Sequence, residues 1–147
     1  MKSTLGLIIL GAVLMIVAIA STSTYEMAEA DPSASIYQYT FTSDTITDTE
    51  ADTLTLPVLL YSKWDYNWTV TTTQESGTTD ITAKLYESHL TSGDGWYQLT
   101  DTLALSGATD LDRLTGSPVA GVRQRIILTG AGTQSTTYTV KAIFKKY

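Results

Sequence analysis

The chain has 147 residues, a formal net charge of −6 and no cysteine. These values predict one domain of ordinary size, held together by packing, strand pairing or assembly rather than by disulfide bonds. An acidic protein repels phosphate, which argues against nucleic-acid binding.

The first feature along the chain is an apolar stretch without charge, LGLIILGAVLMIVAIA at residues 5–20. Lys2 precedes it and Glu26 is the next charged residue, an asymmetry that favours a cytoplasmic N-terminus and an extracytoplasmic domain. Three interpretations stay open. They are a signal peptide with A-x-A-like sites at 18–20 or 28–30, a membrane helix over residues 4–24, and a helix in a filament core.

The remainder divides into a small, acidic linker at residues 25–35 and a domain at 36–147, after a hydrophobic helix at 1–24. Threonine and tyrosine dominate the domain, and such residues favour strands. The alternation of apolar and polar residues that is typical of a strand is clearest at residues 63–73. Further strands are predicted at 36–41, 54–60, 81–88, 96–105, 119–129 and 136–144, with a turn at 74–79 and a loop at 106–118. The predicted fold class is all-β, an antiparallel β-sandwich or jelly roll of seven or eight strands.

Charge is unevenly distributed along the chain. All fifteen acidic residues lie within residues 1–112, whereas residues 113–147 hold six basic residues and no acid. If the last two predicted strands are neighbours, they carry one basic contact face, made of Arg123, Arg125, Lys141 and Lys145. Like charges opposite one another destabilise a sheet unless something acidic covers them, so an acidic loop or a second subunit is the expected cover.

Two further groups of residues are candidates for binding. Calcium would find hard oxygen ligands in Asp44, Asp48, Glu50 and Asp52, although the D-x-D-x-D-G loop order is absent. The alternative is a solvated edge strand or loop. Sugars would stack on exposed aromatic side chains, for which the candidates are Tyr61, Tyr86, Trp96 and Tyr97; packing in the core is the competing interpretation.

Recognisable catalytic chemistry is missing from the sequence. The single histidine, His89, has no G-x-S-x-G elbow with it, and without cysteine no thiol nucleophile or zinc cluster can form. The carboxylates considered for glycosidase chemistry, Glu75, Asp80, Glu87 and Asp94, lie in or beside predicted turns. The sequence therefore predicts a protein that is not an enzyme and needs no cofactor.

Three short patterns carry a resemblance to a known class. They are W-x-V-T-T-T-x-x-S-G-T at 68–78, L-Y-E-S with G-D-G-W-Y-x-L within 85–99, and R-x-R-I-x-L-T-G-x-G-T-Q-S-T at 123–136. Over residues 53–147 the chain resembles small β-sandwich structural proteins of bacteriophage virions, which implies a part in a capsid decoration, spike or fibre. A pilin-like filament subunit is a second resemblance, but the early acidic residue of type IV pilin helices is missing.

The leading hypothesis is a non-enzymatic structural and assembly protein of a virion or cell surface. Its N-terminal helix would hold it in a membrane or filament, and its sandwich would pack against copies of itself or against a capsid or surface protein. The alternative is a secreted or tethered module for glycan binding or adhesion.

Overall fold

The computed structural model describes residues 28–29, 36–60, 64–116 and 121–146. The predicted helix at 1–24 lies outside these residues, and of the predicted linker at 25–35 only 28–29 is described. Over these four ranges every regular element is a strand, and no helix that could cross a membrane is found. The all-β prediction is confirmed for this part of the chain.

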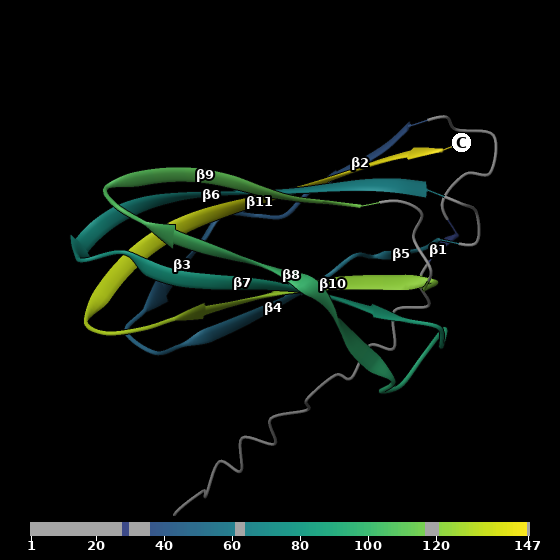
Figure 1. The fold of residues 1–147 in the computed structure, drawn as a ribbon, viewed down its shortest axis with the longest axis horizontal. Helices are drawn as coiled ribbons and strands as arrows, with labels where there is room; N and C mark the ends of the chain where they lie inside the picture. The colour runs from purple at the N-terminus through teal and green to yellow at the C-terminus, as the bar shows by residue number, and fades with distance from the viewer. Residues whose placement is uncertain (1–27, 30–35, 61–63, 117–120, 147) are drawn as a thin grey trace, which may run out of the picture.

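The strands are β1 Ala28–Glu29, β2 Ile36–Thr40, β3 Asp44–Thr47, β4 Ala51–Thr55, β5 Val58–Leu59, β6 Trp64–Gly77, β7 Asp80–Ser88, β8 Trp96–Ser106, β9 Thr109–Gly116, β10 Arg123–Gly130 and β11 Gln134–Lys146. They form two antiparallel sheets that lie in two layers (Figure 1). One sheet has the order β4-β10-β7-β8; in the other, β2 and β3 together line one edge of β11, followed by β6 and β9. A small parallel pair, β1 with β5, forms a third, two-stranded sheet next to the start of β10.

The connections show that this sandwich is a jelly roll. The turns from β3 to β4, β6 to β7, β8 to β9 and β10 to β11 each cross from one sheet to the other, whereas β7 and β8 pair as a hairpin. A four-stranded and a five-stranded layer joined by such crossings have jelly-roll topology, with β2 and β3 sharing one edge position. Gly77 shows why one crossing is tight: its φ of 72° is left-handed, and an added Cβ would overlap the carbonyl oxygen of Thr133.

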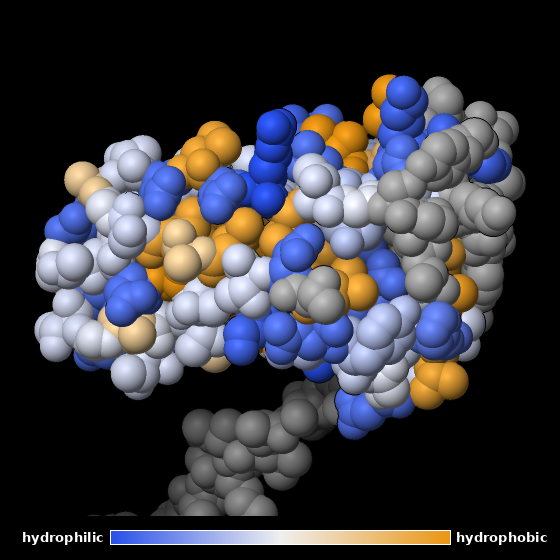
Figure 2. All heavy atoms as spheres, in the orientation of Figure 1, coloured by the Kyte–Doolittle hydropathy of each residue, from blue (hydrophilic) through white to orange (hydrophobic). Residues whose placement is uncertain are grey.

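The core fills the space between the layers with alternate residues of each long strand. Trp64, Trp68, Tyr138 and Phe144 are its largest fully buried side chains. Trp68 stacks on Phe41 with ring centroids 5.7 Å apart and meets Phe144 edge-on, arrangements that aromatic rings prefer. Figure 2 shows apolar surface between the two layers on the visible side, bordered by polar residues.

Two segments predicted as irregular are strands. Residues 109–116 form β9 rather than part of a loop, because this edge strand buries only Leu114 and its polar residues hid the alternation. Residues 74–77 continue β6, since the sheet partner β11 extends along the whole strand and the chain turns only at Thr78.

The single basic face predicted from Arg123, Arg125, Lys141 and Lys145 does not form. The expectation assumed that β10 and β11 pair, but the chain crosses between the sheets at residues 131–133. Arg123 and Arg125 therefore lie on the outer face of one sheet, and Lys141 and Lys145 on the outer face of the opposite sheet. The acidic strands do lie beside the basic ones, with β4 paired to β10 and β3 paired to β11.

Candidate functional site

The strand register gathers four candidate residues on one outer surface. Arg125 pairs with Tyr86, and Arg123 pairs with Ser88, which in turn pairs with Trp96. Since side chains alternate between the faces of a strand, these residues share the face that points away from the core. We call Tyr86, Trp96, Arg123 and Arg125 the cation–aromatic cluster.

The two guanidinium groups lie against the same indole ring. The central carbon of Arg123 is 4.5 Å from the centroid of the Trp96 ring, and that of Arg125 is 4.4 Å from it. Arg125 also lies 5.3 Å from the centroid of the Tyr86 ring. Cation–π attraction of this kind contributes about 0.5–2 kcal/mol per pair, most where water is excluded.

Arg123 organises the hairpin loop next to the cluster. Its Nε donates to the carbonyl oxygen of Leu90 and its Nη2 to that of Gly93, each at 2.6 Å. The side chain is only 7 % exposed. Burial, and then the charge of Arg125, lower the pKa of Arg123, while Asp94 acts in the opposite direction. Arg123 therefore has a positioning role and keeps the loop against the sheet.

Arg125 is the group in the cluster that is available to a partner. It is half-buried, and its buried Nε has no hydrogen-bond partner among the described residues. A guanidinium stacked on aromatic rings keeps its N–H edge for a planar anion such as a carboxylate. Because the Nε of Arg125 is buried, only the accessible end of this half-buried side chain can meet an anionic group on the outer side of the cluster.

Beneath the cluster, the inner face of the same sheet holds a buried carboxylate. Glu87 is 1 % exposed and accepts hydrogen bonds from Gln124 Nε2 at 2.6 Å, the Tyr97 hydroxyl at 2.9 Å and the Gly121 amide at 3.0 Å. Gln124 in turn accepts from Trp68 Nε1 at 2.7 Å. The network ties both sheets together, and because its members come from distant segments no local motif marked it in the sequence.

The predicted aromatic candidates separate into different environments. Tyr86 and Trp96 belong to the cation–aromatic cluster, so arginines already cover part of their rings. Tyr97 lies on the inner side, where burial and its bond to Glu87 raise its pKa to about 12; His89 stacks on it at 5.2 Å. Tyr61 lies outside the described residues.

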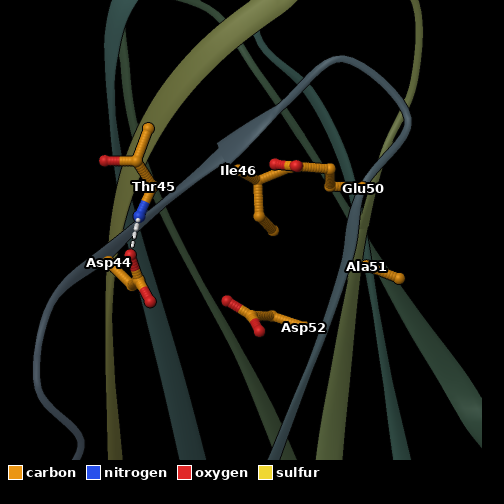
Figure 3. A pocket seen from close by; sticks show the side chains of 6 residues that line it. All are labelled: Asp44, Thr45, Ile46, Glu50, Ala51 and Asp52. Atoms are coloured by element: carbon orange, nitrogen blue, oxygen red, sulfur yellow. Dashed lines mark hydrogen bonds between the residues drawn. The ribbon is translucent and has the colours of Figure 1, made fainter. Parts of the chain in front are cut away.

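The acidic candidates meet at the other end of the domain. Asp44, Glu50 and Asp52 line a recess of about 320 Å³ between β3 and β4, together with Thr45, Ile46 and Ala51. Figure 3 shows Asp44 on one side of this acidic recess, with Glu50 and Asp52 projecting into it from the other. The hydroxyl of the buried Tyr138 donates to Asp52, so that burial and this bond raise the pKa of Tyr138.

Calcium finds no arrangement of ligands in the described ranges. Asp48 does not line the recess. Its carboxylate instead accepts a hydrogen bond from the backbone N–H of Gln134 at 3.2 Å. Among residues 28–29, 36–60, 64–116 and 121–146, no three acidic or histidine side chains are grouped closely enough to hold a metal ion. The recess is therefore an acidic surface feature, and the described residues assign it no metal.

Comparison with known proteins gives likenesses only at the level of structure. No family model and no characterised protein matches the sequence. One similar structure is from a study of Bacillus endospore appendages, described as a family of disulfide-linked pili, with 14 % identity and a TM-score of 0.42 over 80 % of this chain and 93 % of that chain. Another is from the infectious bursal disease virus Gx strain, with 14 % identity and a TM-score of 0.42.

The virus likeness covers 76 % of this chain and 32 % of the virus chain, so this chain corresponds to about a third of that protein. At these TM-scores neither likeness identifies what the chain does.

Proposed function

We propose that the protein is a non-enzymatic structural protein of a virion or cell surface that assembles through its β-sandwich with copies of itself or with a capsid or surface protein. The cation–aromatic cluster is the observation that carries the proposal. Arginine, tryptophan and tyrosine are the residue types enriched among those that contribute most to protein–protein binding. Here Tyr86, Trp96 and Arg125 lie together on a sheet surface and are each half-buried, so a partner can bury them further.

Attachment through the N-terminal segment is a second part of the proposal. The segment 4–24 would hold the protein in a membrane or in the core of a filament. Support comes from the uncharged apolar sequence of residues 5–20, which precedes the β-sandwich in the chain. The intact mass of the native protein tests this: a full-length mass is expected, and loss of residues 1–20 would instead indicate a signal peptide.

A bacteriophage virion is the narrower form of the proposal. It is supported by the sequence patterns at 68–78 and 123–136, which resemble those of small phage β-sandwich proteins. Mass spectrometry of purified virions from lysates of the source organism would detect the chain if it is a virion component. Its presence only in the envelope of uninfected cells would favour a cell-surface protein.

Assembly is tested by sedimentation velocity of the full-length protein over a range of concentrations, with and without detergent. The wild type should form oligomers that grow with concentration. Trp96→Ala should remove much of this association, whereas Leu111→Ala, which changes a 63 % exposed side chain on the other sheet, should leave it unchanged. A wild type that is monomeric in every condition would refute the proposal.

Glycan binding is the alternative, and one observation favours it. The half-buried Trp96 and Tyr86 lie beside the exposed Gln98, a combination of ring and amide that suits a sugar. A glycan array with Trp96→Ala as the control tests this function, and an array without any bound glycan would exclude it.

A further inference from the structure

The cation–aromatic cluster brings two positive charges together on the outer face of its sheet. Arg123 and Arg125 are close enough that the charge of Arg125 lowers the pKa of Arg123, and Asp94 is the acidic group that acts against this. The two guanidinium groups therefore repel one another on a sheet surface where Arg125 is only half-buried. A carboxylate placed over the accessible part of Arg125 would offset this repulsion.

The same domain presents carboxylates that cannot reach its own cluster. Along β10, Arg125 pairs with Thr55 of β4, while Thr129 pairs with Ala51 at the far end, where the acidic recess begins. Arg125 and Thr129 are four residues apart, which corresponds to about 13 Å along a strand. The cluster therefore lies toward the start of β10 and the recess beside its end, between β4 of the same sheet and β3 of the other. A contact of Arg125 with the carboxylates at the recess therefore joins two molecules.

We propose that the cation–aromatic cluster of one molecule binds the carboxylates of the acidic recess of a second copy, with Arg125 as the central contact. This inference rests on the proposed function and names the partner surface of the same site. Charge complementarity favours a second copy as the partner. Asp44 and Glu50 are exposed at the acidic recess, whereas Arg125 lies in the cation–aromatic cluster. The contact is heterologous, so repeating it produces a chain of molecules unless the rotation closes a ring.

In such a chain of molecules, each added copy would place its cluster on the recess of the copy before it.

Charge reversal in the full-length protein tests the proposal. Arg125→Glu and Glu50→Lys should each weaken self-association at least about tenfold, because close charged pairs across interfaces are strongly coupled. An equal mixture of the two variants should associate again, since each supplies the surface that the other lacks. Arg113→Glu, a charge reversal on the exposed part of β9, should associate like the wild type.

The outcomes separate this inference from the proposed function. If the wild type assembles and Arg125→Glu or Glu50→Lys assembles equally well, the contact is wrong but an assembly function stands. If the wild type stays monomeric, both fail. Binding of glucuronate-bearing glycans by a monomeric wild type, lost in Arg125→Glu, would replace the second copy with an acidic glycan.

Discussion

Glu87 carries the clearest energetic role of any single residue in the domain. A buried carboxylate is costly unless several donors satisfy it, and here a glutamine, a tyrosine and a backbone amide do so. In the structure Glu87 follows Ile81, Ala83 and Leu85 on the inner face of β7, although the sequence placed it in or beside a predicted turn. The donors were beyond prediction, because β8, β10 and the segment before β10 supply them only once the sheets have formed.

Replacing Glu87 by alanine should lower the free energy of unfolding by about 3–5 kcal/mol, because the change leaves buried donors without an acceptor. Chemical denaturation measures this. Glu75→Ala is the control, since Glu75 is exposed and accepts a hydrogen bond from the Thr137 hydroxyl at the surface. That control should change stability by less than about 0.5 kcal/mol. An equal change in the free energy of unfolding for both variants would show that the hydrogen bonds of Glu87 do not stabilise the fold more than a surface contact does.

Because the pKa of Tyr97 is raised in the fold, we expect the free energy of unfolding to fall at alkaline pH. An unfolded tyrosine releases its proton near pH 10, whereas the pKa of Tyr97 in the fold is raised to about 12. Between these values the unfolded chain binds fewer protons than the folded chain, so the free energy of unfolding falls as pH rises. In denaturation from pH 9 to 12, Tyr97→Phe should show a smaller fall than the wild type; parallel curves would contradict this.

At the scale of elements, the sequence predicted most strands and missed how they connect. Alternation of apolar residues reports which face of a strand is buried, so β2, β6, β7 and β8 were close to their predicted ranges. It does not report which sheet a strand joins. The glycines at 130 and 132 suggested a turn, and only the packing of both layers makes that turn a crossing.

Two glycines in the turns between the sheets allow the cost of a left-handed backbone to be measured separately from the cost of steric overlap. Gly77 and Gly132 both have a left-handed φ, 72° and 71°, but only at Gly77 would an added Cβ meet backbone atoms. Gly132→Ala should therefore cost about 1 kcal/mol for its conformation alone. Gly77→Ala should cost at least about 2 kcal/mol more, because backbone at Thr133 must also move. Equal melting temperatures of the two variants would contradict this account.

At the scale of the whole molecule, the jelly roll brings together two groups of residues for which the sequence predicted separate roles. Tyr86 and Trp96 were candidates for sugar stacking, and Arg123 and Arg125 for a basic face. Pairing of β10 with β7 and of β7 with β8 joins them into one cluster. Such long-range pairings could not be read from spacing, since these residues are separated by up to 39 positions in the chain.

Assembly through charges at two ends of one domain should depend on salt. Raising the ionic strength from about 0.1 M to 1 M shortens the screening length from about 10 Å to 3 Å, which weakens attraction between exposed charged surfaces. The mean oligomer size, measured by light scattering, should therefore fall as salt is added and recover on dilution into low salt. An oligomer that grows with salt would indicate an apolar contact instead.

The central claim is that the outer face of the β4-β10-β7-β8 sheet is covered in an assembly of this protein. Cryo-electron microscopy of the assembled full-length protein tests it most directly. The account predicts that Trp96 and Arg125 are buried against the β3–β4 end of a neighbouring copy. An assembly in which this face is open to solvent, while copies meet elsewhere, would contradict it.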